Sequence, residues 1–194
     1  MQRAEWSWRT VDIVVAAAIA IAFGVVFWAW NQVWAAATPA FAAVPPAQNI
    51  LYGVWLVPAV LAGLVVRKPG AALFTELVAA SVSAILGSQW GLDTLVSGAL
   101  QGLGAEVVFF IARYRLWTMI IAIVAAAVTA LAAWIHDTPL YYADLGIGPQ
   151  LVILAFMVVS AVIIAGVGSW LLMRSLVQTG VLAQFAAGRA QTRV

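Results

Sequence analysis

The sequence predicts an all-α membrane protein, a single bundle of six transmembrane helices with both termini in the cytoplasm. Three observations predict it. The 194 residues are 65% hydrophobic and only 8% charged, whereas a soluble domain of this length carries about 25% charged residues. Charged and turn-forming residues divide the chain into six apolar stretches, most of them close to the roughly 20 residues that cross a bilayer. All the lysines and arginines fall on one side of that arrangement.

The six predicted spans follow one another with short connections. The second and third are separated only by Arg67, Lys68 and Pro69, which indicates a tight turn, and Pro58 is expected to kink the second. Asp93, directly before Thr94, is the expected N-cap of the fourth. His136 and Asp137 are expected in the loop after the fifth. The predicted spans are 10–36, 50–66, 70–87, 93–112, 116–135 and 150–174, and together they form one domain over residues 1–194.

The positions of the cations orient the bundle. The nine basic residues lie before the first span, in the turns after the second and fourth, and after the sixth, so the positive-inside rule places both termini in the cytoplasm. The outer loops at 37–49, 88–92 and 136–149 contain no lysine or arginine, and Asp93, Asp137 and Asp144 give this side a mildly negative character that favours cations or neutral molecules over phosphates. The basic residues are Arg3, Arg9, Arg67, Lys68, Arg113, Arg115, Arg174, Arg189 and Arg193.

Composition argues against several kinds of chemistry. The chain has no cysteine and one histidine, His136, which excludes thiolate sites and argues against histidine-rich metal sites. The glycine-rich stretch GALQGLGAE at 98–106 lacks the GKS/T ending of a phosphate-binding loop and lies inside an apolar segment. We therefore expect no enzyme activity, no metal, no bound cofactor and no nucleic-acid partner. Any use of ATP would belong to other subunits.

Aromatic residues gather toward the outer ends of the predicted spans. Phe27, Trp30, Asn31 and Trp34 follow i, i+3, i+4, i+7 spacing and share one helix face. Aromatic walls with a few polar groups are the usual makeup of a small-molecule pocket, although an interfacial aromatic belt is the alternative explanation. The residues predicted to contact a ligand are Trp30, Asn31, Trp34, Tyr52, Trp55, Glu76, Gln89, Trp90, Gln101, Glu106, His136, Tyr141 and Tyr142.

Two carboxylates lie within apolar segments, at Glu76 and Glu106. A charge at the bilayer centre costs at least about 2.5–3.5 kcal/mol, so it persists only with a partner or a purpose. Glu76 lies roughly 9 Å along its helix from Gly70 and shares a face with Ala80 and Ser83. The alternative is a structural carboxylate that backbone or hydroxyl donors satisfy, or Arg113 in the case of Glu106.

Small residues recur at four-residue spacing on two predicted helices. Ala16, Ala20 and Gly24 form such a stripe on the first span, and Gly98 and Gly102 form another on the fourth. Stripes of this kind let helices approach closely in lipid. The first stripe is predicted either to pack inside the bundle or to dock a partner protein.

Three blocks of the sequence resemble a known family. LVVRKPGAALFTELVAA, ILGSQWGL and QGLGAEVVFFIARYR are similar to the YkoE type of substrate-binding S component from energy-coupling factor (ECF) vitamin transporters, and the similarity covers about residues 67–115. The six helices, the cytoplasmic termini and the chain length fit the same family over the whole sequence.

The resemblance implies a function and a set of partners. It implies a multi-pass protein of a bacterial plasma membrane that captures thiamine or its hydroxymethylpyrimidine precursor near the outer side. It also implies a transmembrane T component, docked in the family through small residues of the first helix (here Ala16 and Ala20), and two cytoplasmic ATPases. Two other hypotheses remain open at this point: an intramembrane enzyme that uses Glu76 and Glu106, and a structural subunit without a small-molecule ligand.

Overall fold

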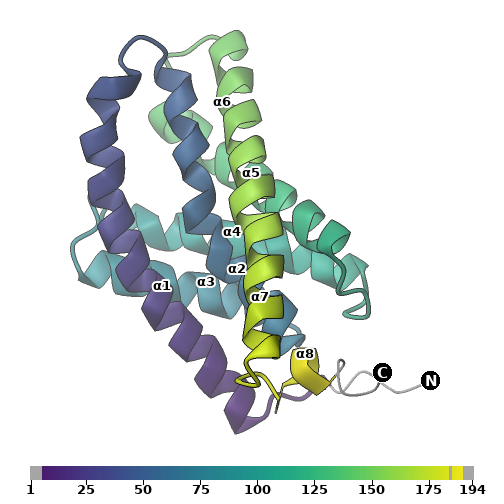
Figure 1. The fold of residues 1–194 in the computed structure, drawn as a ribbon. Coiled ribbons are helices and arrows are strands. Elements are labelled where there is room, and N and C mark those ends of the chain that lie inside the picture. The colour runs from purple at the N-terminus through teal and green to yellow at the C-terminus, as the bar shows by residue number, and fades with distance from the viewer. Residues whose placement is uncertain (1–5, 184, 190–194) are drawn as a thin grey trace.

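The computed structural model describes residues 6–183 and 185–189, and every regular element in these ranges is helical (Figure 1). Arg3 and Arg193, which the positive-inside argument uses, lie outside the described residues. In chain order the elements are α1 (Thr10–Ala37), the 3₁₀ helices η1 (Thr38–Phe41) and η2 (Pro45–Leu56), α2 (Val57–Val66), α3 (Ala71–Ile85), α4 (Asp93–Ile111), α5 (Met119–Tyr141), α6 (Ile147–Ser160), the π-helical segment η3 (Ala161–Gly168), α7 (Ser169–Gln178) and α8 (Ala186–Arg189).

The prediction of an all-α membrane bundle is confirmed. Five continuous helical stretches are long and apolar enough to cross a bilayer: Thr10–Phe41, Pro45–Val66, Asp93–Ile111, Met119–Tyr141 and Ile147–Gln178. The sixth helix, α3, has 15 residues, or about 22 Å at 1.5 Å per residue, which is less than the roughly 30 Å of hydrocarbon. This helix is therefore too short to cross the hydrocarbon in a perpendicular orientation.

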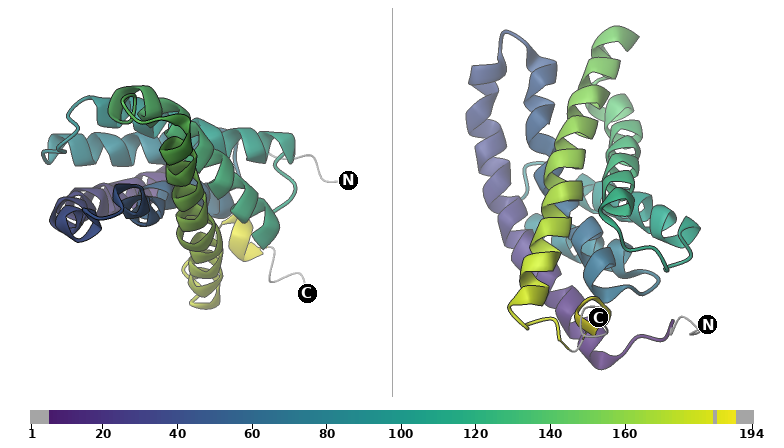
Figure 2. Two further views of the ribbon diagram at one scale, coloured as in Figure 1. Left: turned by 90° about the horizontal axis from the view of Figure 1, so that it is seen from above. Right: turned by 45° about the vertical axis from the view of Figure 1, so that its right-hand side comes forward.

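Helix α2 is the centre of the molecule. All ten of its residues are buried, and it packs against α1, α3, α4, α5, η3 and α7. Both views of the ribbon show η2, which leads into α2, running beside α1 (Figures 1 and 2). Because this helix is apolar on every side, the bundle can enclose it without leaving a polar side chain unpaired.

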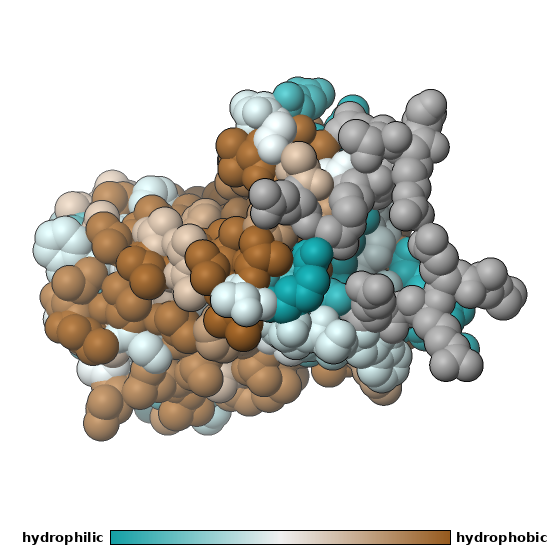
Figure 3. Space-filling view, turned by 90° about the horizontal axis from the view of Figure 1, so that it is seen from below, coloured by the Kyte–Doolittle hydropathy of each residue, from teal (hydrophilic) through white to brown (hydrophobic). Residues whose placement is uncertain are grey.

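The charged residues separate the two ends of the bundle. The beginning of α1 and the end of α7 lie at the same end (Figure 1), together with the basic turns between α2 and α3 and between α4 and α5. Two of these turns use left-handed backbone at Arg67 (φ 57°) and Arg113 (φ 54°). On the face seen from below, apolar side chains cover the left and centre, and hydrophilic residues gather toward the right and the top (Figure 3). The shared end of the basic turns fits the predicted orientation.

The second span differs from its prediction because its first half is a 3₁₀ helix. It begins at Pro45 rather than near residue 50, and Pro58 lies at the start of α2, where its missing N–H costs nothing, rather than at a kink. Ser160 enters the backbone ladder of η2: its hydroxyl donates to the Ile50 carbonyl (2.5 Å) and accepts from the Gly53 amide (2.9 Å). Gly53 has no side chain because a Cβ would lie 2.5 Å from the Ser160 carbonyl oxygen.

Two further boundary predictions are wrong. Helix α5 continues to Tyr141 instead of ending near residue 135, so His136 and Asp137 are helical and not a loop pair. Asp93 is the first residue of α4, and its carboxylate does not cap the helix. Both corrections have one cause: the side chains of Asp93, His136 and Tyr141 bond to one another and join the beginning of α4 to the end of α5.

The stripe of small residues on α1 is an internal contact. Ala16 and Ala20 are fully buried, and a Cβ at Gly24 would lie 2.4 Å from the Val82 Cβ. Helix α3 occupies this face. In this conformation Ala16 and Ala20 have no accessible surface and Gly24 is buried, which favours the packing alternative. Docking of a partner through Ala16, Ala20 and Gly24 stays a prediction.

Candidate ligand-binding site

A cavity of about 350 Å³ lies at the outer end of the bundle, opposite the basic turns. Helices α1, η2, α3, α4 and α5 all contribute to its wall. None of the described residues that line it is a lysine or an arginine. The lining residues are Phe27, Asn31, Trp34, Thr38, Pro45, Gln48, Asn49, Tyr52, Trp55, Glu76, Ala80, Ser83, Ser88, Trp90, Asp93, Thr94, Ser97, Gly98, Gln101, Asp137, Tyr141 and Tyr142.

Four aromatic side chains form one side of the cavity. The Trp55 ring lies 5.1 Å from Trp34, 5.3 Å from Tyr52 and 5.3 Å from Trp90, measured between centroids. These rings are tilted or edge-to-face, the arrangements that aromatic pairs prefer. They supply faces on which a flat ligand can stack.

The 3₁₀ winding of η2 brings its polar and aromatic side chains into one row. Asn49, Tyr52 and Trp55 are three residues apart, and all three line the cavity. A 3₁₀ helix has 3.0 residues per turn, so side chains at i and i+3 eclipse one another. In an α-helix, successive members of this series would turn away from each other by about 60°. The local helix type therefore determines which face of the segment meets the cavity.

Glu76 forms the polar floor of the cavity and is fully buried. Its Oε2 accepts a hydrogen bond from the Ala59 amide at 2.8 Å. This amide belongs to the first turn of α2, where backbone donors have no partner within the helix. The other oxygen, Oε1, has no hydrogen-bond partner among the residues that the structure describes. A buried acceptor of this kind is unusual in proteins and calls for an explanation.

Close helix packing holds Glu76 in place. A Cβ at Gly102 would lie 2.8 Å from the Leu73 Cα and 3.1 Å from the Glu76 Cβ, and one at Gly98 would lie 2.5 Å from the Ala80 Cβ. The two glycines of α4 therefore let α3 approach closely enough for its polar face to border the cavity.

Asn31 is buried in the cavity wall between the aromatic rings and α3. Its carbonyl oxygen accepts from the Trp55 indole N–H at 3.1 Å. Its amide donates to the hydroxyls of Ser83 and Ser88, each at 3.4 Å. These bonds fix the Trp55 ring and leave little freedom in the wall.

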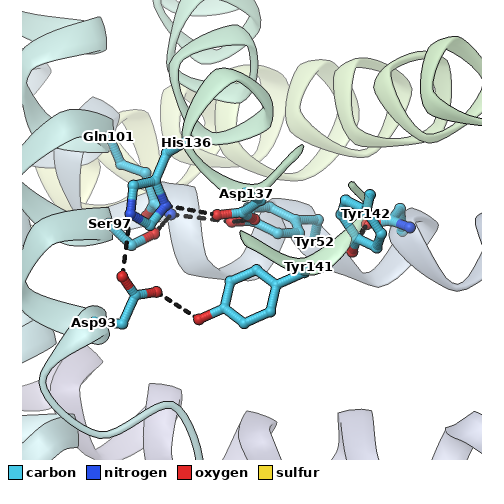
Figure 4. Close-up of polar contacts among 9 residues, drawn as sticks. Tyr52, Asp93, Ser97, Gln101, His136, Asp137, Tyr141 and Tyr142 are labelled. Carbon is cyan, nitrogen blue, oxygen red and sulfur yellow. Dashed lines mark hydrogen bonds and ion pairs between the residues drawn. The ribbon is translucent and has the colours of Figure 1, made fainter. Parts of the chain in front are cut away.

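A second polar group closes the flank of the cavity between α4 and α5 (Figure 4). Asp137 accepts from the Tyr52 hydroxyl at 2.6 Å, and the Gln101 amide donates to that hydroxyl at 3.2 Å and to Ser97 at 2.7 Å. The four groups of this network come from three helices, so it ties η2, α4 and α5 together.

Tyr142 closes the outer edge next to this network. Its hydroxyl donates to the Asn49 side-chain oxygen at 3.3 Å. Burial is the main cause, together with the nearby Asp137, that raises the pKa of Tyr142 to about 12. The phenol therefore remains a neutral donor at physiological pH.

Nine of the thirteen residues predicted to contact a ligand line the cavity, and four do not. Trp30 lies behind the wall, where its indole N–H donates to the Leu51 carbonyl at 2.9 Å. Gln89 is exposed in the loop after α3. His136 contacts two lining carboxylates without lining the cavity itself. The nine that line it are Asn31, Trp34, Tyr52, Trp55, Glu76, Trp90, Gln101, Tyr141 and Tyr142.

Glu106, the fourth, is a residue of α4 that binds the beginning of α3 as a structural carboxylate. It accepts from the backbone amides of Gly70 (2.6 Å), Ala72 (3.1 Å) and Leu73 (3.4 Å), which are the free donors at the beginning of that helix. The Tyr114 hydroxyl donates to it at 2.6 Å, and burial together with this carboxylate raises the pKa of Tyr114. The backbone-donor alternative for Glu106 therefore holds, and Glu76 and Glu106 do not form a pair.

Several lining residues were not predicted. Asn49 could have been found from its spacing of three to Tyr52 and Trp55, and Ser97 from its spacing of four to Gln101. Asp93 and Asp137 were treated as a cap and a loop residue, because neither the extension of α5 nor its contact with α4 leaves a local signal. The other polar lining residues outside the predicted contact set are Thr38, Gln48, Ser83, Ser88 and Thr94.

The donor set suits an organic ligand. Nowhere in the described ranges do three or more His, Cys, Asp or Glu side chains gather so that they could hold a metal ion. The cavity instead combines aromatic faces, amide and hydroxyl groups and three carboxylates, those of Glu76, Asp93 and Asp137.

Comparison with known proteins agrees with this architecture. Residues 11–132 match the family model described as an ABC-type cobalt transport system, permease component. The chain is 34% identical over 184 residues, 94% of its length and 92% of the relative's, to YkoE of Bacillus subtilis (strain 168), a protein named as an HMP/thiamine permease protein.

A solved structure extends the similarity to the whole fold. It is described as the crystal structure of an S-component of ECF transporter, and it superposes with a TM-score of 0.91 at 33% identity, covering 96% of this chain and 94% of its own. Identity above 30% over nearly the full length of both proteins shows common membership. The chain belongs to the family of substrate-binding S components of ECF transporters, of the YkoE type.

Proposed function

We propose that the cavity binds thiamine or its hydroxymethylpyrimidine half from the outer side of the membrane. The observation that carries this proposal is the bare Oε1 of Glu76 at the floor of an aromatic cavity. The name of the similar YkoE protein, an HMP/thiamine permease protein, supports the same ligand class.

The chemistry of the ligand matches the wall. Both molecules contain an aminopyrimidine, a flat ring with an exocyclic amino group that donates hydrogen bonds. The rings of Trp34, Trp55 and Trp90 offer stacking faces, and Glu76 Oε1 offers the acceptor that an amino group requires. The cavity volume of about 350 Å³ lies within the range of about 300–1,000 Å³ typical of small-molecule sites.

The charge of the wall adds a preference within that class. Glu76, Asp93 and Asp137 all line the cavity, and no described lining residue carries a permanent positive charge. The thiazolium of thiamine is a cation, which such a wall attracts and which tryptophan faces also bind. A pyrophosphate group would meet three carboxylates and no lysine or arginine among the described lining residues.

Delivery of the ligand across the membrane depends on other subunits. The chain is a transport subunit and not an enzyme, since its relatives are S components. Glu76 and Glu106 bond to different backbone amides, at the beginning of α2 and at the beginning of α3, and not to each other. We propose that a T component and two ATPases complete the transporter. The sequence itself contains no GKS/T phosphate-binding loop.

Calorimetry on the detergent-solubilised chain tests the proposal. Thiamine, hydroxymethylpyrimidine and thiamine pyrophosphate are titrated separately into the protein. We expect one-to-one binding of thiamine, hydroxymethylpyrimidine or both, and binding of the pyrophosphate at least about tenfold weaker than that of thiamine, a difference of 1.4 kcal/mol. Equal or tighter binding of the pyrophosphate would contradict the charge argument, and no binding of any of the three would reject the ligand class.

A further inference from the structure

His136 stands between two carboxylates that line the cavity, although it does not line the cavity itself. Its Nδ1 lies 2.9 Å from Asp137 Oδ1, and its Nε2 lies 3.2 Å from Asp93 Oδ1 (Figure 4). The other oxygens of these carboxylates accept from the hydroxyls of Tyr52 (2.6 Å) and Tyr141 (2.5 Å). The histidine therefore joins the beginning of α4 to the end of α5.

The hydrogen-bond geometry of this bridge favours a charged imidazole when both acids are ionised. A neutral imidazole has one donor nitrogen and one acceptor nitrogen, and ionised carboxylates only accept. A neutral His136 would therefore direct a lone pair at one of the two acids. An imidazolium donates to both and brings a positive charge to an end of the bundle where no described residue is a lysine or arginine.

The surroundings of His136 are otherwise acidic or phenolic. Asp93 faces it from α4, Asp137 is its neighbour on α5, and Tyr52, Tyr141 and Tyr142 lie next to these acids. Glu76 adds a third carboxylate on the α3 side of the cavity. The His136 side chain is 8% exposed and that of Asp93 is 28% exposed, so a proton that leaves the imidazole has a route to water along Asp93.

We propose that His136 is a positioning residue whose protonated form balances the charges of Asp93 and Asp137 when no ligand is bound. A cationic ligand then takes over this electrostatic role, and its binding releases the histidine proton to solvent. A cation in the cavity is attracted by Asp93 and Asp137 and repels the imidazolium between them. A neutral ligand in the same place leaves His136 protonated. This inference rests on the proposed ligand class and adds to it the dependence on ligand charge.

Two ligands already named distinguish these cases. Both ligands contain an aminopyrimidine, and only thiamine also carries a permanent cation, its thiazolium. Any proton exchange by the aminopyrimidine ring therefore contributes to the binding of both ligands and cancels in the comparison. Binding enthalpies are measured by calorimetry in buffers of different ionisation enthalpy at one pH, which gives the number of protons released. We expect up to one more proton released with thiamine than with hydroxymethylpyrimidine, and thiamine affinity that rises with pH by at most about tenfold per unit.

Variants at position 136 assign the proton. His136→Gln keeps a donor without a titratable charge and should release the same number of protons with both ligands. His136→Lys keeps a positive charge and should weaken thiamine binding more than hydroxymethylpyrimidine binding. Thermal unfolding of each variant checks that it is folded, and the comparison of the two ligands in the unmodified protein stands without them.

Each outcome has a defined meaning. Equal proton release for the two ligands in the unmodified protein, or an undiminished difference in His136→Gln, would overturn the inference. Binding of hydroxymethylpyrimidine alone would overturn it and leave the proposed function standing. Failure of both ligands to bind would reject the proposed function and this inference with it.

Discussion

At the scale of one residue, Glu76 shows how a carboxylate that is energetically unfavourable in the membrane indicates a binding site. A carboxylate in the hydrocarbon region costs at least about 2.5–3.5 kcal/mol unless it is compensated, and the Ala59 amide compensates only one of its oxygens. The second oxygen has no hydrogen-bond partner among the described residues, and the side chain lines a cavity whose aromatic wall matches a flat ligand. This combination is the basis for the proposal that a ligand completes the hydrogen bonds of Glu76.

Replacement of Glu76 by glutamine should weaken binding while the protein stays folded. The glutamine carbonyl can still accept from the Ala59 amide, but the charge-assisted bond to a ligand amino group is lost. Such a bond contributes about 1.5–3 kcal/mol, so we expect the dissociation constant for thiamine to rise roughly ten- to a hundredfold. Calorimetry gives this value directly.

Glu106→Gln is the matched control for that experiment. It makes the same chemical change on a carboxylate that bonds backbone amides at the beginning of α3. We expect a loss of about 1 kcal/mol in stability, as for a helix cap, and an unchanged thiamine affinity. If Glu76→Gln binds like the unmodified protein, or if Glu106→Gln weakens binding equally, the assignment of Glu76 to the ligand is wrong.

Residue type and spacing predicted the aromatic and acidic composition of the site but not its exact membership. Glu76 and Glu106 look alike in the sequence, and only the approach of the α3 amides separates the cap from the cavity residue. Trp30 and Trp34 share a helix face, yet the position of η2 turns one indole to the Leu51 carbonyl and leaves the other in the cavity. Both distinctions depend on neighbours that are distant in the sequence.

At the scale of the elements, α3 depends on close contacts on two sides. Helix α1 packs on one side through Ala16, Ala20 and Gly24, and α4 packs on another through Gly98 and Gly102. Packing of this kind is a main source of helix association in lipid. Because α3 carries Glu76, these contacts also set the geometry of the cavity floor.

Gly102→Ala should lower both stability and affinity. Its new methyl group would lie 2.8 Å from the Leu73 Cα, which is backbone and cannot turn aside, so α3 must move and take Glu76 with it. Gly148→Ala is the matched control, because a Cβ there meets no atom within 4 Å. We expect a lower unfolding temperature and weaker thiamine binding only for Gly102→Ala. Equal behaviour of the two variants would show that the α3–α4 contact tolerates the methyl group.

Ala20→Leu distinguishes the packing role of the small-residue stripe on α1 from a docking role. Ala20 is fully buried, and overpacking of a close contact costs about 1–3 kcal/mol. Ala22→Leu makes the same change at an exposed position of the same helix. Thermal unfolding should separate them, with a clear loss only for Ala20→Leu. An unaffected Ala20→Leu protein that no longer assembles with its partner subunits would support the docking hypothesis.

The presence of each helix was predictable, because a long apolar stretch in a membrane has few alternatives to a helix. The type of each helix and the residues at which it ends were not predictable. The 3₁₀ winding of η2 depends on Ser160, which is more than a hundred residues away. The extension of α5 depends on the bonds between Asp93, His136 and Tyr141 across two helices. Neither has a local signature.

At the scale of the whole molecule, the basic turns and the cavity lie at opposite ends of the bundle. The described basic turns mark the cytoplasmic end under the positive-inside rule, while the carboxylates of the cavity lie at the other end. This polarity was predictable in full, because it depends on counting cations along the chain and on no three-dimensional detail.

Labelling of single cysteines tests the orientation. The chain has no cysteine, so each introduced thiol reports alone. Ala43→Cys, between η1 and η2, should react with a membrane-impermeant maleimide on intact cells. Leu116→Cys, in the turn between α4 and α5, is 54% exposed for the native side chain and should react only after lysis. The reverse pattern would show that the bundle is inverted.

The 3₁₀ winding of η2 also determines how far this segment reaches along its axis. A residue rises about 2.0 Å in a 3₁₀ helix and 1.5 Å in an α-helix, so the twelve residues of Pro45–Leu56 reach about 6 Å farther than the same residues would as α-helix. Rewinding this segment would draw its outer end toward the bilayer centre. It would also fan Asn49, Tyr52 and Trp55 over an arc of about 120°. One local change of pitch would thus take apart a wall of the cavity.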